Sequence, residues 1–286
     1  MVSPSRYFNE EEVARATSYH RPLYWAGAAG LVLDAGALAL LAWSSVGDAQ
    51  DPASLPWAAR AAVDAVAVVA VLTLVGLPLG FATGFLRERR WGFSTQELSS
   101  WIGDQVKGFL VNAVLAAAAF VGVVAVARAL AGWWAVPVAA GLAALAFVLS
   151  FLAPIVLEPL FNRYAPLGDE ALLEALRRLA VRAGVPVRDV LVQDASRRTR
   201  KANAYVSGLG RTRRVVVSDT LLEEASPGEV QLVVAHELGH RRHRHVAVGT
   251  ALLMAVTAVT VLVVWAALGT QAVSYTHLTL PTSDLV

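Results

Sequence analysis

Five long apolar stretches constrain the fold of this chain more than any other feature of its sequence. An α-helix needs about 20 apolar residues to cross the hydrocarbon core of a bilayer, and each stretch reaches that length. Hydrophobic residues make up 56% of the 286 residues and charged residues 16%, and the mean hydropathy is +0.55. Soluble domains of this size are more polar. We therefore expect a polytopic α-helical membrane protein with spans near 23–43, 61–85, 109–131, 133–157 and 246–268.

The distribution of lysine and arginine predicts how these spans are oriented. Basic residues gather in the N-terminal tail, in 87–108 and in 158–245, whereas the loop 44–60 carries one arginine beside two aspartates. Because basic residues are enriched on the cytoplasmic side, we expect these three segments to face the cytoplasm, at the plasma membrane of a bacterium. The first stretch could also be a cleaved signal peptide, but its length favours an anchor. No aromatic stacking pattern interleaves the arginines, so we expect a lipid bilayer and no nucleic acid as partner.

Two acidic residues lie inside the expected spans. Asp34 is near the middle of the first span, and Asp64 is near the start of the second. Ionisable groups inside a membrane usually face a bundle interior or a wet cavity. For Asp64 an interfacial position is the simpler interpretation, whereas for Asp34 a cavity-facing role and a structural hydrogen bond both stay open.

A short motif, His236-Glu237-Leu238-Gly239-His240, predicts a metal site. Two histidines at i and i+4 lie one turn apart on one helix face, so both imidazoles can reach a single ion. The glutamate between them is placed to activate a water on that metal. The chain has no cysteine, so histidine and carboxylate must supply the ligands. The expected cofactor is one zinc ion, with His236 and His240 as ligands and Glu237 as catalytic base.

The residues before the motif predict that it lies on a helix. Ser226 and Glu229 have the spacing of a capping box, and Pro227 suits the first helical position. An apolar stripe at helical spacing follows, formed by Val230, Val233, Val234 and Leu238. The alternative is a surface helix that carries two histidines by chance, and the cap and the stripe both argue against it.

The segment 158–245 reads as a small α+β domain of the zincin type inserted between spans. Helical periodicity covers 171–183, and Gly184 and Pro186 end it. Short strands are expected at 190–192, 203–207 and 214–218, the last two joined by a glycine-containing hairpin loop. In such domains an edge strand beside the zinc helix often binds an extended peptide by strand addition. The candidate substrate-binding residues are therefore Asn203, Ala204 and Tyr205, although an ordinary structural hairpin fits the same sequence.

Several further pieces of sequence are similar to the type I CAAX prenyl protease family of integral-membrane zinc metalloproteases. In chain order they are RWGFSTQ (90–96), DQVK (104–107), PIVLEPLFN (154–162), APL (165–167), ANAYVSG (202–208), VVVSDTLL (215–222) and HELGH (236–240), with His245 beyond. The resemblance implies a helical bundle around a hydrated chamber that a metalloprotease domain closes. It implies zinc held by His236 and His240, Glu237 as general base, and a substrate-holding strand at 203–205. The implied substrate is a lipidated (CAAX-type) or membrane-associated polypeptide.

The chain departs from this family at the third zinc ligand. The resemblance implies a glutamate downstream, after further membrane sequence, but no acidic residue follows Glu237 until Asp284. Two histidines alone leave a zinc site short of the usual three protein ligands. His243 or His245 could substitute, but both lie in the run RRHRH, which is typical of a basic membrane-interface face.

The last residues suggest a reason for this departure. The segment 273–286 resembles a translated adapter sequence and matches neither the apolar run before it nor the family, so we expect it to be non-native. We expect the natural protein to continue beyond 272, and the present chain to be a truncated, inactive fragment. We therefore expect four regions in the chain: a membrane region with four spans at 1–157, the catalytic segment at 158–245, a fifth span at 246–268 and the non-native tail at 273–286.

Other functions remain open on the sequence alone. An HtpX-like quality-control protease would use the same motif, although such proteases have fewer spans before it. A relative that has lost its third ligand would be a non-catalytic, peptide-binding membrane protein. A transporter-like or structural protein with a coincidental motif is disfavoured by the order of family-like segments.

Overall fold

A computed structural model describes residues 9–43, 55–208 and 210–269 of the chain. The chain divides into two compact units, Met1–Val121 and Gly122–Val286. Four described helices are long and apolar enough to cross a membrane. They are Glu10–Trp43, Trp57–Arg90, Leu98–Ala129 and His245–Leu268. The expectation of a polytopic helical membrane protein with a small sheet domain is therefore confirmed, and residues 44–54 and 270–286, which include the expected non-native tail 273–286, lie outside the described residues.

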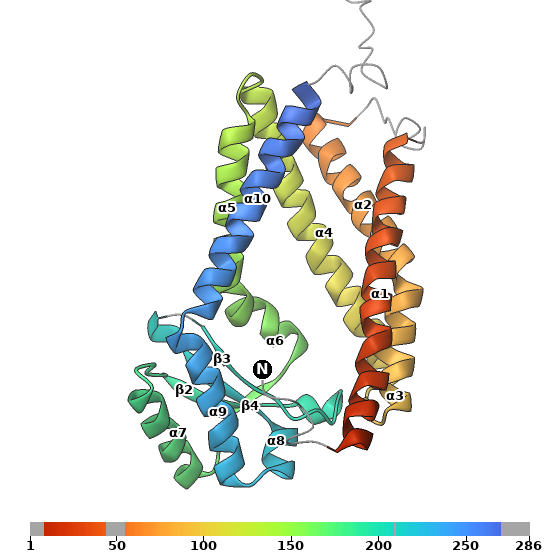
Figure 1. The fold of residues 1–286 in the computed structure, drawn as a ribbon. Coiled ribbons are helices and arrows are strands. Elements are labelled where there is room, and N and C mark those ends of the chain that lie inside the picture. The colour runs from red at the N-terminus through yellow and green to blue at the C-terminus, as the bar shows by residue number, and fades with distance from the viewer. Residues whose placement is uncertain (1–8, 44–54, 209, 270–286) are drawn as a thin grey trace, which may run out of the picture. The chain divides into compact units, whose positions relative to one another are not determined.

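The first unit consists of long membrane helices that continue beyond the apolar stretches. Helix α1 contacts α2, and α2 runs on through a π-helical segment into α3 (Figure 1). The polar first turns of α1 contact the junction between the π-helical segment and α3. There the Tyr19 hydroxyl donates to Glu88 at 2.5 Å, and Arg87 donates to the carbonyl oxygen of Ser18. The bounds are α1 Glu10–Trp43, α2 Trp57–Gly80, η3 Phe81–Arg87, α3 Glu88–Arg90 and α4 Leu98–Ala129, whose last residues belong to the second unit.

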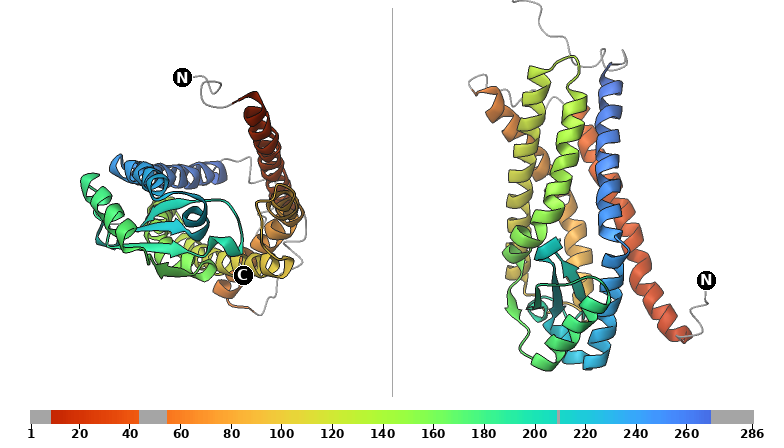
Figure 2. Two further views of the ribbon diagram at one scale, coloured as in Figure 1. Left: turned by 90° about the horizontal axis from the view of Figure 1, so that it is seen from below. Right: turned by 90° about the vertical axis from the view of Figure 1, so that its left-hand side faces the viewer.

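The membrane helices of the second unit are α5 (Ala135–Leu152) and α10 (His245–Gly269), which run side by side (Figures 1 and 2). The expected span 133–157 is not one straight helix. Its two helical parts, Ala135–Ser150 and Ile155–Phe161, meet at 54°. A π-helical turn, η4 (Ala153–Leu157), separates α5 from α6 (Glu158–Phe161). The sequence places a proline at 154. Proline has no N–H to donate to the helical hydrogen-bond ladder, and this missing bond accounts for a bend here.

The sheet of the second unit has four strands in the order β1-β2-β4-β3, so β3 is an edge strand. Strand β2 pairs with β4 in parallel, and β3 pairs with β4 as the expected antiparallel hairpin. Strand β1, antiparallel to β2, was not expected from the sequence, nor was α8. The bounds are β1 Tyr164–Pro166, α7 Glu170–Arg182, β2 Asp189–Gln193, η5 Ala195–Arg197, β3 Ala204–Ser207, η6 Gly210–Thr212, β4 Arg214–Ser218, α8 Asp219–Glu224 and α9 Pro227–Arg242.

Helices α7 and α9 contact each other and share one apolar core with the sheet. Leu176 of α7, Val215 and Val217 of β4, and Val234 and Leu238 of α9 are all fully buried there. Burying side chains of this size contributes about 1.5–3 kcal/mol each before the entropy of ordering is subtracted. This core fixes the position of α9 relative to the sheet.

The hairpin between β3 and β4 depends on a glycine. Gly208 has φ +79°, and a Cβ atom there would lie 2.4 Å from the carbonyl oxygen of Thr212. No side chain fits such a close approach, so glycine is required at this turn. The turn sets the register in which Tyr205 lies opposite Val216.

Candidate metal centre

Helix α9 presents the H-E-x-x-H motif on the side away from its core. The capping box expected from the sequence is present: Ser226 accepts from the N–H of Glu229, and the Glu229 carboxylate accepts from the N–H of Ser226. Val230, Val234 and Leu238 point into the core. His236 and His240 are exposed on the opposite face. The position of both imidazoles therefore follows from the helical period and from the burial of the apolar stripe.

The two imidazoles converge on one point. The Nε2 atoms of His236 and His240 lie 3.1 Å apart, and their ring centroids are 4.7 Å apart. In a tetrahedral zinc site with Zn–N distances of about 2.0–2.1 Å, two nitrogen ligands are separated by about 3.3 Å. The donor pair therefore fits zinc without rearrangement of the helix. Glu237 is half-buried on the same helix between the two histidines.

No third ligand is brought to this point by the part of the chain that the structure describes. Among residues 9–43, 55–208 and 210–269, no three His, Cys, Asp or Glu side chains are grouped so that they could hold a metal ion. His245 contacts His240, but through the Nδ1 atoms, which are 2.7 Å apart. This is the ring nitrogen that does not face His236, so His245 does not join the pair as a ligand. Asp284 lies outside the described residues.

The edge strand β3 lies beside α9 and is fastened to it by Arg241. Arg241 Nε donates to the carbonyl oxygen of Val206 at 3.0 Å, and its Nη2 donates to the same oxygen. Burial lowers the pKa of the Arg241 guanidinium, as does neighbouring Arg213, whereas Glu158 and Glu237 raise it. The sequence offered no signal for the contact between Arg241 and Val206, which joins residues 35 positions apart.

The hydrogen-bond pattern of the hairpin decides which backbone groups of β3 point away from β4. The N–H of Ser218 donates to the carbonyl oxygen of Asn203, and the N–H of Asn203 donates to Ser218 Oγ, both at 2.9 Å. In an antiparallel pair, bonded and non-bonded residues alternate, so Tyr205 also faces β4 while Ala204 and Val206 face outward. Of the three expected substrate-binding residues, Ala204 directs its backbone groups away from β4 but is itself only 4% exposed, and Asn203 and Tyr205 direct theirs into the sheet.

The Tyr205 side chain belongs to a polar cluster that links α6 to the sheet. Its hydroxyl lies 3.1 Å from that of Tyr164 and donates to Glu158 Oε2 at 3.3 Å, and Arg214 Nη2 lies 3.3 Å from the same carboxylate oxygen. Burial raises the pKa of Tyr205, and the bond to Tyr164 and the charge of Glu158 raise it further. Both phenols therefore stay protonated at neutral pH. Glu158 lies in the PIVLEPLFN segment quoted above, which is the signal that could have found it.

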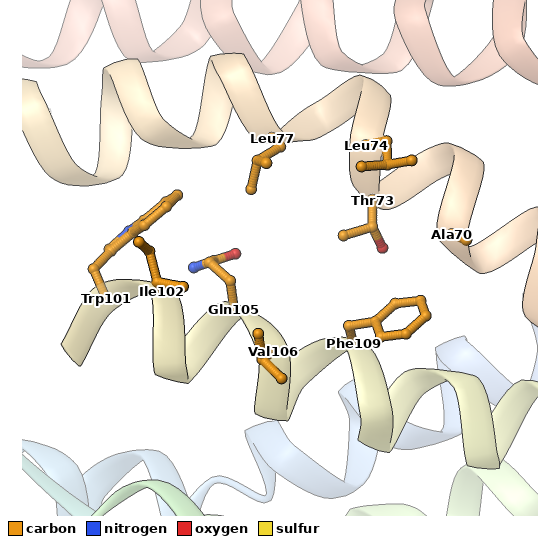
Figure 3. Close-up of a pocket in the computed structure, with 9 residues that line it drawn as sticks. All are labelled: Ala70, Thr73, Leu74, Leu77, Trp101, Ile102, Gln105, Val106 and Phe109. Carbon is orange, nitrogen blue, oxygen red and sulfur yellow. The ribbon is translucent and has the colours of Figure 1, made fainter. Parts of the chain in front are cut away.

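A cavity of about 370 Å³ lies between α2 and α4 in the first unit (Figure 3). Its walls are apolar apart from Thr73 and Gln105, and none of the residues expected to form the metal site lies there. The lining residues are Ala70, Thr73, Leu74, Leu77, Trp101, Ile102, Gln105, Val106 and Phe109.

Comparison with family models gives two adjoining matches. The model described as CAAX prenyl protease N-terminal, five membrane helices, matches residues 5–163. The model described as peptidase family M48 matches residues 166–283. The first match covers more than half of the chain. The second includes the zinc helix and also extends into the segment 273–286, for which the sequence analysis expects a non-native origin.

Curated relatives and a solved structure agree with these matches. The chain is 31% identical over 173 residues to a CAAX prenyl protease 1 homolog of Oryza sativa subsp. japonica, covering 60% of this chain and 41% of that protein. It is 33% identical over 181 residues to CAAX prenyl protease 1 of Saccharomyces cerevisiae, covering 61% and 39%. It is 32% identical over 184 residues to the uncharacterized metalloprotease YhfN of Bacillus subtilis, covering 63% and 42%. The chain thus spans about two fifths of the length of these relatives.

The crystal structure of S. mikatae Ste24p has the same fold. The TM-score is 0.76 at 23% identity, over 90% of this chain and 64% of that chain. At this identity the likeness concerns the fold alone. It supports the arrangement of membrane helices with a small sheet domain that the sequence predicts.

Proposed function

Because the chain belongs to the CAAX prenyl protease family, we propose that it is the zinc-binding part of a membrane-embedded metalloendopeptidase. His236 and His240 hold the ion, and Glu237 is the general base. The observation that carries this proposal is the 3.1 Å separation of the two Nε2 atoms. That geometry suits zinc, on a helix that leads directly into the apolar helix α10.

The protein residues divide the chemistry among them. Bound zinc supplies Lewis acidity, which polarises a carbonyl oxygen and makes water easier to deprotonate. The Glu237 carboxylate takes the proton of the attacking water and passes it to the leaving amine. The outward-facing backbone groups of Ala204 pair with an extended peptide by strand addition. Arg241 keeps β3 in place beside the zinc helix. A peptide bound along β3 would therefore have a fixed position relative to His236 and His240.

A lipidated (CAAX-type) or membrane-associated polypeptide is the substrate class that suits this site. The membrane helices α5 and α10 belong to the same unit as the sheet, which supports a substrate that is itself held at the membrane. The arginine-rich segment 158–245 supports a cytoplasmic position for the site. An HtpX-like protease that removes damaged membrane proteins would use the same machinery.

A non-catalytic, peptide-binding membrane protein is the second candidate. It is favoured by one observation, the presence of two rather than three metal ligands among the described residues. A zinc ion with two protein ligands is bound weakly, so we propose that the 286-residue chain alone is a poor catalyst or inactive. Appreciable zinc-dependent proteolysis by the purified chain would exclude this second candidate.

Substitution of Glu237 by glutamine tests the role assigned to it. The amide cannot accept the proton of water, but it preserves the shape of the helix and leaves both imidazoles in place. Glu237→Gln should therefore bind zinc as the unaltered chain does, measured as metal content after equilibrium dialysis, and should be inactive in any form of the enzyme that turns over. Loss of zinc from this variant would instead make Glu237 a ligand or a structural residue.

A further inference from the structure

We propose that His245 is a positioning residue of the metal centre, which holds the His240 imidazole so that its Nε2 atom faces His236. This inference rests on the proposed function of His236 and His240 as a zinc site. It assigns a role to a histidine that is neither a ligand nor a catalytic base.

The contacts of the His240 ring define this role. On one side, its Nε2 atom lies 3.1 Å from Nε2 of His236. On the other side, its Nδ1 atom lies 2.7 Å from Nδ1 of His245, with the ring centroids 4.9 Å apart. A neutral imidazole carries one N–H, and the partner of one nitrogen selects which tautomer is present. When Nδ1–H of His240 donates to His245, the Nε2 lone pair is left free for a metal.

Histidine ligands almost always donate their other ring nitrogen to such a partner. The usual partners are carboxylates, carbonyl oxygens and water, and they fix ring orientation and raise ligand basicity. Here Nδ1 of His245, 2.7 Å from Nδ1 of His240, takes this place. With two ligands among the described residues, the orientation of each has a large influence on affinity.

The backbone between the two helices makes this contact possible. In an uninterrupted helix, residue 245 would be rotated about 140° around the axis from residue 240. Helix α9 instead ends at Arg242, Arg244 has a φ of 57°, and α10 begins at His245. Left-handed backbone is uncommon for a residue other than glycine, and it concentrates at functional sites. The turn at Arg244 redirects the chain so that His245 returns to the His240 ring.

His243 provides a matched control. It is the C-cap residue of α9 and is exposed, and its ring stacks on that of His245 with centroids 5.8 Å apart. Its N–H bonds the carbonyl oxygen of Gly239 at 3.0 Å, a backbone contact that any residue would make. Replacing His243 removes an imidazole from the same basic run without removing the partner of His240 Nδ1.

The experiment measures Co²⁺ and Zn²⁺ affinity of the full 286-residue chain in detergent, for the unaltered protein and for His245→Ala, His245→Asn, His243→Ala and His236→Ala. His245→Ala should lower affinity about 10- to 100-fold, the usual effect of losing such a partner. His245→Asn should restore affinity to within about threefold, because its amide oxygen occupies the place of Nδ1 and accepts the same bond. His243→Ala should bind as the unaltered chain does.

A second measurement reads the tautomer directly and does not depend on affinity. The chain has six histidines, so ¹⁵N-histidine spectra can be assigned by substitution. In the zinc-free unaltered chain His240 should be protonated mainly at Nδ1, and in zinc-free His245→Ala both tautomers should be populated. Circular dichroism confirms that each variant is folded.

The outcomes separate this inference from the proposed function. If His236→Ala binds metal as well as the unaltered chain, or the unaltered chain binds none, the zinc site is wrong and this inference falls with it. If His236→Ala loses binding but His245→Ala does not, the zinc site stands and the positioning role is wrong. Failure of His245→Asn to rescue binding would also overturn the positioning role, because an acceptor alone would not explain the loss.

Discussion

Among single residues, Asp219 shows how one carboxylate organises the turn that precedes the metal helix. Its oxygens accept from the N–H of Ser196 at 2.9 Å, from the Ser196 hydroxyl at 2.5 Å and from the N–H of Thr220 at 2.8 Å. Burial raises the pKa of Asp219, but these bonds outweigh it and hold the pKa below its ordinary value. The carboxylate thereby fastens η5 to the start of α8.

This lowered pKa predicts a pH dependence of stability. The stabilisation by Asp219 is fully present above the pKa of an unfolded aspartate, about 3.9, and is lost as the pH falls through the lower folded pKa. Asp219→Asn should therefore lower the melting temperature at pH 7. Below about pH 4 the melting temperatures of the variant and the unaltered chain should approach each other. Thermal unfolding followed by circular dichroism at several pH values measures this.

Asp189→Asn is the matched control for that prediction. Asp189 is an exposed carboxylate 3.4 Å from Arg188, and exposed pairs of this kind contribute little. A loss of stability for Asp219→Asn that stays constant from pH 7 to pH 2 would contradict the account, because it would not depend on the charge of the carboxylate.

At the scale of elements, the edge strand β3 and its alternating bonds determine how a peptide can bind. The backbone N–H of Ala204 points away from β4, so Ala204→Pro removes an N–H that the sheet does not use, at a residue that is only 4% exposed. The variant should keep the pairing of β3 with β4 but should bind a pool of fluorescein-labelled hexapeptides at least about tenfold more weakly by anisotropy, since strand addition depends on such backbone groups.

Tyr205→Pro is the contrasting variant, because it removes an N–H that bonds β4. It should lose the fold of the sheet, seen as a lower melting temperature and exposed apolar surface. If Ala204→Pro binds the hexapeptides as well as the unaltered chain does, peptide recognition does not use the edge of β3, and the role expected for residues 203–205 is wrong.

The elements differ in how far sequence alone could predict them. The capping box at Ser226 and the apolar stripe of α9 are local signals, so the helix and the exposed face that carries its two histidines could be predicted. Strand β1 has three residues, too few for a period, and its place depends on pairing with β2. The contact between His245 and His240 depends on the left-handed turn at Arg244, and no propensity predicts arginine in that conformation.

For the whole molecule, the central prediction concerns how the chain crosses the membrane. The expected orientation puts the loop 44–54 on one side and the segment 158–245 on the cytoplasmic side. The chain has no cysteine, so single cysteines can be introduced without background labelling. In intact cells a membrane-impermeant maleimide should label Ala53→Cys, and should label Arg182→Cys, on the exposed face of α7, only after lysis. Labelling of Arg182→Cys in intact cells would reverse the proposed orientation.

The most direct test of the account is zinc titration of the purified chain, of its His236→Ala and His240→Ala variants, and of the double variant that carries both substitutions. The Nε2 atoms, 3.1 Å apart, predict one ion per chain, with affinity lowered strongly by either substitution and no measurable site left in the double variant. Equal binding by the double variant and the unaltered chain would contradict the metal site, and with it the proposed metalloendopeptidase.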